Sequence, residues 1–329
     1  MSRWFASPAI GMLAAAVLAS SSASAQQNAR TAAPAAKAPA AARTPDGHPD
    51  LQGNWNFATV TPLERPAQFA GKDKLSDEEA AAFAKETVER TDADRRTRGT
   101  AGDVGLAYNQ FWYDRGTKTI GTNRTSLIVD PQDGRLPAQT PEAQKAAAAR
   151  AAIRAGNTEG PETRSLSERC LVFNAGPPLL PGPYNNNIQI VQTKDSVVIV
   201  SEMIHDVRVV PLDGRPHAPN AIRNWFGDAR GRWERDTLVV ESTNFGDKSA
   251  VRGTDRNLRL TERFTRVSAD VLNYEFTIDN PTAYVKPWTV SLPMSRLDDK
   301  IYEYACHEGN YGMEGMLKSA RATDQQGAR

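Results

Sequence analysis

The sequence predicts a mainly β fold, in which an antiparallel meander closes into a barrel or packs as a two-sheet sandwich, with accessory helices from the N-terminal half. Eight strand-like runs follow Cys170, and helical patterns almost disappear from that point. The connections between the runs are short and contain turn pairs such as KD, DG and DN. Because an open sheet edge invites pairing with other chains, a long meander is expected to close.

The first 25 residues have the pattern of a secretory signal peptide. Arg3 precedes the apolar run IGMLAAAVLA, and the small residues ASA end at Ala25, where we expect cleavage. The run is about ten residues long, whereas a membrane span needs ~20, and no other stretch comes closer. We therefore expect no membrane span and a periplasmic or secreted protein. The Ala/Pro-rich residues 26–45 predict a flexible tether, and residues 46–329 predict a single β-rich domain.

A first strand and a first helix open this domain. Within residues 51–57, apolar and aromatic residues alternate with polar ones, which indicates a strand. Ser76 and Glu79 then form the capping-box pattern that begins a helix over residues 76–92.

A second helix and the meander complete the predicted elements. Pro141 after Thr140 begins an alanine-rich helix over residues 140–155, and a strand is expected near 125–134. A short final helix is expected in MEGMLKSARA. The strand-like runs of the meander are 188–193, 196–204, 207–212, 237–243, 258–267, 271–278, 284–294 and 301–306.

Two short motifs refine the fold class. Gly53-Asn54-Trp55 in the first strand resembles the G-x-W signature of the lipocalin family, and Gly231-Arg232-Trp233 repeats its spacing. The resemblance implies a calycin-like barrel. The alternative is that each motif is a turn glycine before a core tryptophan.

Charge and cysteine content limit the partners of the protein. The chain has 40 Lys+Arg and 39 Asp+Glu, and the predicted signal peptide removes only Arg3, so the mature chain is neutral. No basic excess indicates nucleic acid, which leaves a small-molecule ligand or substrate. Cys170 and Cys306 are the only cysteines, and in an oxidising compartment we expect a disulfide rather than two free thiols.

Carboxylates recur in the strand-like runs. Alternation of side chains allows two interpretations: they face water outside an apolar barrel, or some lie inside, paired with arginines such as Arg208 or Arg263. The second requires partners, because an unpaired buried carboxylate is costly. The glutamates are Glu202, Glu241, Glu262, Glu275 and Glu303.

The run MIHDVR supplies candidate catalytic groups. His205 is a candidate general base, because histidine is the residue type best suited to that role near neutral pH, although a histidine among apolar neighbours is often structural. Asp206 and Arg208 are expected on the same face of the strand. Either Asp206 is a catalytic acid and Arg208 binds the substrate, or the two residues form a structural ion pair.

Two loops offer candidate substrate-binding residues. The loop over residues 214–233 is long enough to form a lid or wall, or it is surface decoration, and it contains His217, Arg223 and Trp225. The segment PGPYNNN contributes Tyr184 and Asn187, where asparagines either shape a turn or present amides to a ligand.

The stretch YEYACHEGNYGMEG concentrates the remaining candidates. If its strand continues through Cys306, then Glu303 and His307 share one face and Tyr304 and Cys306 the other. A disulfide would hold His307 and Glu308 rigidly at the rim of the barrel. Catalytic roles are therefore predicted for Glu303, Tyr304, His307 and Glu308 as well as for His205 and Asp206.

The motifs TPDGHPDLQG, MIHD, GRW, DTLVVE and ACHEGNYGMEG together resemble a widespread family of exported bacterial proteins without a characterised function. The likeness spans most of the chain from Asp46 onward. It implies export and a single extended domain, and it implies no catalytic residue.

Three functions follow from these observations. The first is an enzyme without an organic cofactor, a lyase, isomerase or hydrolase, that acts on a small aromatic or sugar-derived molecule by His/Glu/Tyr acid–base chemistry. No cofactor-binding motif occurs, and a divalent metal held by His205, His307 and a glutamate is a minor alternative. The second is a periplasmic lipocalin-like binding protein, and the third is an interaction or envelope protein.

Overall fold

The structure is a computed structural model that describes residues 42–97, 99–100, 109–156, 160–174, 176–247, 251–306 and 311–327. The predicted signal peptide and most of the predicted tether lie outside these residues.

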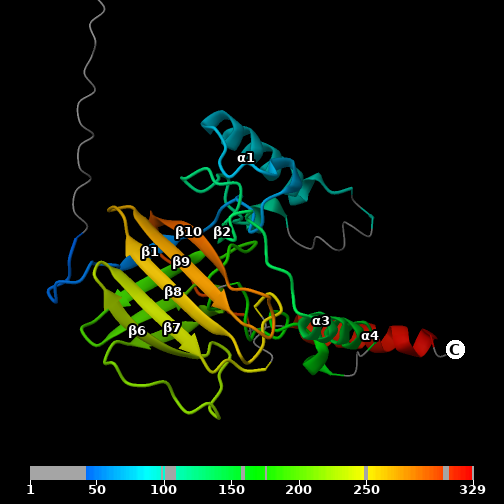
Figure 1. The fold of residues 1–329 in the computed structure, drawn as a ribbon. Coiled ribbons are helices and arrows are strands. Elements are labelled where there is room, and N and C mark those ends of the chain that lie inside the picture. Colours follow the sequence, from blue (N-terminus) through cyan, green and yellow to red (C-terminus); the bar gives the residue numbers. More distant parts are fainter. Residues whose placement is uncertain are drawn as a thin grey trace, which may run out of the picture. The chain divides into compact units, whose positions relative to one another are not determined.

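A ten-stranded antiparallel sheet dominates the described chain, as Figure 1 shows, so the mainly β prediction is confirmed. Nine strands follow the order β5-β4-β3-β1-β10-β9-β8-β7-β6, and β2 pairs with β10. The short first strand β1 lies between β3 and β10, so it joins two runs of sequential hairpins into one sheet. The strands are β1 (Gly53–Asn56), β2 (Ile128–Asp130), β3 (Asn187–Gln192), β4 (Ser196–Ser201), β5 (Val207–Pro211), β6 (Asp228–Glu234), β7 (Thr237–Thr243), β8 (Arg259–Arg266), β9 (Val271–Asp279) and β10 (Trp288–Leu297).

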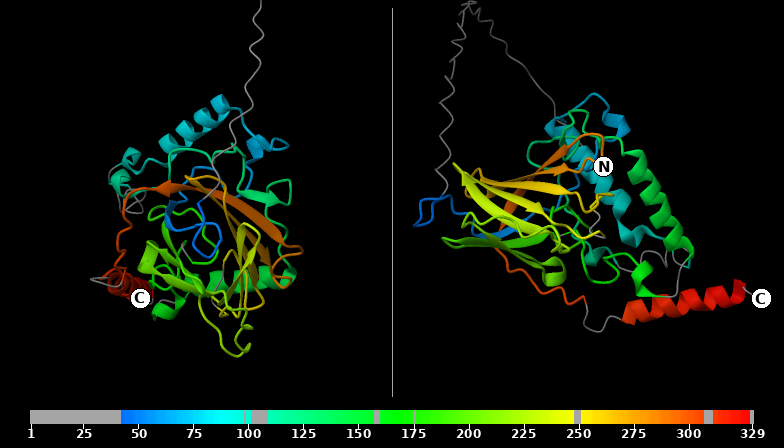
Figure 2. Two further views of the ribbon diagram at one scale, coloured as in Figure 1. Left: turned by 90° about the vertical axis from the view of Figure 1, so that its left-hand side faces the viewer. Right: turned by 60° about the horizontal axis from the view of Figure 1, so that its bottom comes forward.

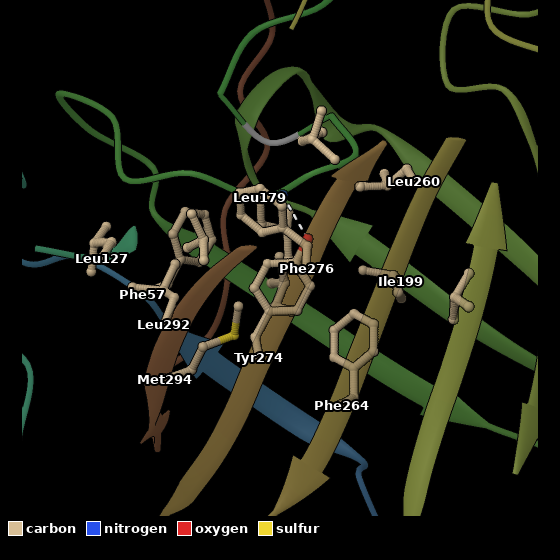
Figure 3. Packing of buried hydrophobic residues seen from close by; sticks show 14 of the residues in the cluster. Phe57, Leu127, Leu179, Ile199, Leu260, Phe264, Tyr274, Phe276, Leu292 and Met294 are labelled. Carbon is tan, nitrogen blue, oxygen red and sulfur yellow. Dashed lines mark hydrogen bonds between the residues drawn. The ribbon is translucent and has the colours of Figure 1, made fainter. Parts of the chain in front are cut away.

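The sheet curves around the larger of two hydrophobic clusters found among the described residues. In Figure 2, right, the yellow strands β6–β8 lie opposite the green strands β3–β5. Figure 3 shows side chains from β4, β8, β9 and β10 meeting in the space between, including Ile199, Phe264, Tyr274 and Leu292. Trp55 of the G-x-W motif is fully buried in this core, as the alternative interpretation of that motif expects.

The sheet is not closed into a barrel. Its two edge strands, β5 and β6, are not hydrogen-bonded to each other in the described chain. Side chains of β5 and the following residue lie against β6 instead: a Cβ added at Gly231 would lie 2.8 Å from Cγ1 of Val210 and 2.6 Å from Cδ2 of Leu212. The barrel prediction expected a hydrogen-bonded ladder between these two edge strands. Packing of apolar side chains takes the place of that ladder.

Three α-helices accompany the sheet in the described chain: α1 (Asp77–Thr91), α3 (Pro141–Gly156) and α4 (Tyr311–Gly327). The predicted capping box at the start of α1 is present, because Ser76 and Glu79 exchange side-chain and backbone hydrogen bonds. The Thr140 hydroxyl accepts from the backbone N–H of Ala143 and caps α3. Short 3-10 turns occur at Ala67–Phe69, Ala93–Arg95, Gln110–Trp112, Pro161–Thr163 and Met203–His205.

Two predictions of strands and loops are wrong. Residues 301–306 form no strand, because side chains rather than a neighbouring strand bind their backbone: Glu202 accepts from the N–H of Tyr302, and His205 contacts the carbonyl of Tyr304. The predicted loop over 214–233 ends early, because β6 begins at Asp228 and pairs with β7. The signal for β6 was weak, since Gly and Arg interrupt its apolar pattern.

The disulfide between Cys170 and Cys306 is present, as predicted, with a Cα–Cα distance of 5.7 Å. It ties the segment between α3 and β3 to the segment after β10. Within the described residues, no helix has the length and apolar character needed to cross a membrane.

Candidate functional site

The connection between β4 and β5 has an unusual backbone. The N–H of Ser201 donates to the carbonyl of Asp206 and closes the hairpin. Inside it, Ile204 and His205 have φ of +59° and +47°. Hairpin turns with two such residues normally contain Asn-Gly, and a β-branched residue is rare in this conformation. The hairpin therefore stores strain, of the kind that clusters at functional sites.

Ile204 and Met203 form one wall of a cavity of about 210 Å³. Both are buried. The opposite wall is aromatic: the ring of Tyr184 stacks on Tyr304 at a centroid distance of 5.9 Å and on Phe173 at 6.3 Å. We call this cavity the hairpin pocket; it is lined by Ser167, Glu168, Phe173, Tyr184, Met203, Ile204, Tyr304 and Cys306.

His205 lies beside this pocket with a defined tautomer. Its Nδ1 is 3.1 Å from the carbonyl oxygen of Tyr304. A carbonyl oxygen only accepts, so Nδ1 donates in this contact, and Nε2 is the ring nitrogen that does not take part in it. The His205 side chain is exposed, so a solute can reach it.

Asp206 is the adjacent acid. It is partly buried, and desolvation raises the pKa of its carboxyl from 3.8 to about 6, while the neighbouring His205 acts in the opposite direction. A carboxyl with this pKa exchanges protons near neutral pH, as a general acid or base must.

Two carboxylates, Glu202 and Asp114, lie near the hairpin and interact through their charges. Glu202 is buried, accepts from the amide of Asn187 at 2.7 Å, and accepts from the N–H of Tyr302 at 2.9 Å. Asp114 retains exposed surface, yet its pKa is raised, by desolvation first and by the negative charge of Glu202 second. Asn187 thus contributes to this network, whereas Asn185 has a left-handed turn conformation and the Asn186 side chain caps the loop before β3.

Arg208 does not serve the hairpin pocket. Its guanidinium points into the core and pairs with both carboxylate oxygens of Glu262, at 3.1 and 2.5 Å. The hydroxyl of Tyr274 donates to Glu262 and accepts from the N–H of Leu179. Burial disfavours the charged form of Arg208, but Glu262 outweighs this effect and the pKa of Arg208 is raised. Burial, followed by the charge of Glu262, raises the pKa of Tyr274 well above its ordinary value.

The strand glutamates therefore divide between the two interpretations. Glu262 lies inside and is paired with an arginine, as the second interpretation required. Glu241 and Glu275 lie on the other face, where Glu241 pairs with Arg232 near the surface. Glu303 is exposed.

The loop candidates bind within their own region. His217 contacts Asp228 at 3.0 Å, and the pKa of Asp228 is lowered because hydrogen bonds from Ala218, His217 and Arg230 outweigh its desolvation. Arg223 donates to two backbone carbonyls, and Trp225 is partly exposed. His217, Arg223 and Trp225 are not among the described residues that line the hairpin pocket.

His307 and Glu308 lie outside the described residues, so their predicted roles stay predictions. Within the described residues, no group of three or more His, Cys, Asp or Glu side chains is placed to hold a metal ion. The metal alternative depends on His307.

Sequence reasoning missed several residues of this region. Phe173 and Met203 are ordinary apolar residues, and no local sequence pattern indicates that they pack in one cluster. Asp114 lies in the aromatic run FWYDRG. Its position between Tyr113 and Arg115 was the only sequence feature that could have indicated a place near the site.

No protein-family model matches the chain, and a search of curated proteins finds none with significant similarity to it.

Proposed function

We propose that the protein is an exported, cofactor-independent enzyme that binds a small apolar or aromatic molecule in the hairpin pocket and acts on it by acid–base chemistry. One observation carries the proposal: two consecutive non-glycine residues with positive φ place Ile204 in the pocket wall and His205 beside it. Backbone strain of this kind needs a compensating advantage, which catalysis provides.

His205 is the general base in this proposal. The Tyr304 carbonyl holds its tautomer, so Nε2 is available to take a proton. Asp206, with a pKa of about 6, is the acid that returns a proton to the substrate. Proton transfer between two such groups supports elimination, isomerisation or hydrolysis.

The substrate is small and carries an aromatic or planar group. The rings of Tyr184 and Tyr304, whose faces are inclined by 26° to each other, both line the pocket, and its volume of about 210 Å³ lies just below the range usual for drug-sized ligands. A sugar-derived substrate is compatible with such faces, because saccharides also bind on aromatic rings.

A binding protein is the second candidate. It is favoured by the apolar lining of the pocket, in which Glu168 already accepts hydrogen bonds from Ser165. Its ligand would not occupy the interior of the curved sheet as in a lipocalin, because Phe264, Tyr274, Phe276 and other side chains fill that space. A calycin-like relationship is supported only by the curved antiparallel sheet and the G-x-W spacing.

Export is supported by the disulfide, since such bonds persist in oxidising compartments. The N-terminal sequence pattern adds to this support.

The test is a time-resolved ¹H NMR screen of small aromatic and glycosidic esters, lactones and β-substituted carbonyl compounds in D₂O. We expect turnover or solvent deuterium incorporation for one class, and its loss by about 10²-fold or more in His205→Asn. His217→Asn is the matched control, because that histidine also makes a hydrogen-bond contact through Nδ1 but does not line the pocket. Full turnover in both His205→Asn and Asp206→Asn would rule out the acid–base mechanism, whereas binding without turnover would favour the binding protein.

A further inference from the structure

A second cavity, of about 410 Å³, lies next to the C-terminal half of α1. Its apolar surface includes Leu63, Leu127 and Leu180 together with Pro181 and Pro183. Nothing in the proposed acid–base chemistry uses this cavity, which shares no lining residue with the hairpin pocket. We call it the arginine cavity.

Two cations and several hydroxyls supply its polar surface. Arg115 and Arg252 both line the cavity, and so do Thr59, Thr87 and Thr91, whereas no carboxylate is among its described lining residues. The lining therefore carries a charge of +2, which follows from two arginines and no acid. An unbalanced positive lining favours an anionic group.

The two arginines differ in how they are held. Arg115 donates through Nη1 to the carbonyl of Thr91 at 2.7 Å, and its guanidinium lies 3.7 Å from the centroid of the Tyr113 ring. It is thus fixed by two contacts and retains further N–H donors. No ion pair is found for the guanidinium of Arg252 among the described residues, and Arg252 is exposed. A fixed cation and an available one form a clamp that an anion can complete.

The wall that carries the prolines is rigid. The Asn186 side chain accepts from the N–H of Gly182 at 2.7 Å and donates to the carbonyl of the same residue at 3.1 Å. It is fully buried. A preformed wall lowers the entropy cost of binding.

We propose that the arginine cavity binds a small amphipathic monocarboxylate, with its carboxylate between Arg115 and Arg252 and its apolar body against Leu63, Leu127 and Leu180. A single negative charge fits better than a phosphate dianion. The cavity faces the last turns of α1, at Thr87 and Thr91, and a helix C-terminus carries partial negative charge. The apolar surface is of no use to a simple inorganic anion.

Isothermal titration calorimetry with octanoate tests this site. We expect binding to the wild-type chain, and about ten- to a hundredfold weaker binding by Arg252→Gln, because a charge-assisted contact is lost. Octanamide, the neutral isostere, is expected to bind wild type at the same weakened level and to be unaffected by Arg252→Gln. Arg259→Gln is the matched control, because Arg259 is an exposed arginine that does not line the cavity.

Arg252→Glu provides a second variant with a gain of binding. It is expected to lose octanoate and to bind octylamine instead. The proposal is overturned if Arg252→Gln binds octanoate as wild type does, if Arg259→Gln causes the same loss, or if inorganic phosphate displaces octanoate at equal concentration. Unchanged thermal unfolding of each variant excludes misfolding as the cause of a loss.

Discussion

At the scale of single residues, the strained hairpin is the feature that most needs an explanation. A positive φ costs a non-glycine residue roughly 1–2 kcal/mol, and Ile204 and His205 both have one. Burial of Ile204 in the pocket wall offsets part of that cost. The exposed His205 is held by the contact of its Nδ1 with the carbonyl of Tyr304 and by the hydrogen bond from its backbone N–H to the carbonyl of Glu202.

This strain predicts a difference between two substitutions of His205. Both His205→Gly and His205→Ala remove the imidazole, but only glycine adopts φ near +47° without a Cβ penalty. We expect His205→Gly to be more stable than His205→Ala by about 1 kcal/mol in urea unfolding. Equal stability of the two variants would contradict the left-handed conformation.

Asp206 predicts a pH dependence of stability. Its carboxyl titrates near 3.8 when unfolded and near 6 when folded, so the native state holds a proton that the unfolded state has released. Below pH 3.8 this group has no effect; stability falls as pH rises from 3.8 to 6, and the full penalty applies above 6. Asp206→Asn should therefore stabilise by about 1–2 kcal/mol at pH 7.5, after allowance for partial exposure, and by little near pH 4.

Thermal unfolding at both pH values measures this effect. Asp213→Asn is the control, because Asp213 is an exposed carboxylate whose pKa the neighbouring Arg215 lowers. That variant should show no gain at pH 7.5. A gain for Asp206→Asn that is the same at pH 4 and pH 7.5 would show that the titration of Asp206 is not its source.

The buried pair of Arg208 and Glu262 predicts a large loss from a small change. Glu262→Gln leaves the guanidinium of Arg208 charged and unpaired in the core, at a cost of about 3–5 kcal/mol. Glu241→Gln, which breaks a pair near the surface with Arg232, should cost about 0–1 kcal/mol. Urea unfolding compares the two, and a Glu262→Gln loss no larger than that of Glu241→Gln would mean that Arg208 reaches water.

At the scale of elements, the segment over 301–306 shows what strand patterns cannot predict. Its alternation of apolar and polar residues is that of a strand, yet Glu202 and His205 bind its backbone in place of a ladder. The alternation of side chains nevertheless predicted that Tyr304 and Cys306 lie on the same side of the segment, and both line the hairpin pocket. That Glu202 and His205 would bind this segment depends on tertiary contacts about 100 residues apart in the chain.

The disulfide predicts how this segment responds to reduction. Cys170→Ser combined with Cys306→Ser removes a link across 136 residues, and we expect a loss of about 2–4 kcal/mol. The amides of residues 301–305 should then exchange with solvent much faster, while those of β10 change little, because β10 pairs with β9 along most of its length. Hydrogen exchange with mass spectrometry measures both, and unchanged protection at 301–305 would show that the disulfide does not hold the segment.

At the scale of the whole molecule, the sequence predicted the sheet well and its closure poorly. The alternation of apolar and polar residues within runs such as 271–278 identifies strands, because this pattern lies within one short segment and about half of its residues are buried. Closure depends on how β5 and β6 meet, and Gly231 lets apolar side chains occupy that place. No local pattern encodes such a contact.

The candidate site was predicted in part for the same reason. His205 and Tyr304 were predicted as catalytic side chains, and the structure places Nδ1 of His205 3.1 Å from the backbone carbonyl oxygen of Tyr304. Arg208 was expected to bind substrate but serves the core, because a buried glutamate on the opposite side of the curved sheet needed a partner. The position of a charged residue within a strand does not reveal its partner.

The central claim is that ligands bind at the hairpin pocket. Methionine methyl groups labelled with ¹³C test it directly, because Met203 lies in the pocket wall and Met294 lies in the core of the sheet. With a bound small aromatic ligand, the account predicts a shift of the Met203 signal, assigned through Met203→Leu, and none for Met294. A ligand that shifts Met294 and leaves Met203 unchanged would place binding inside the sheet and contradict the account.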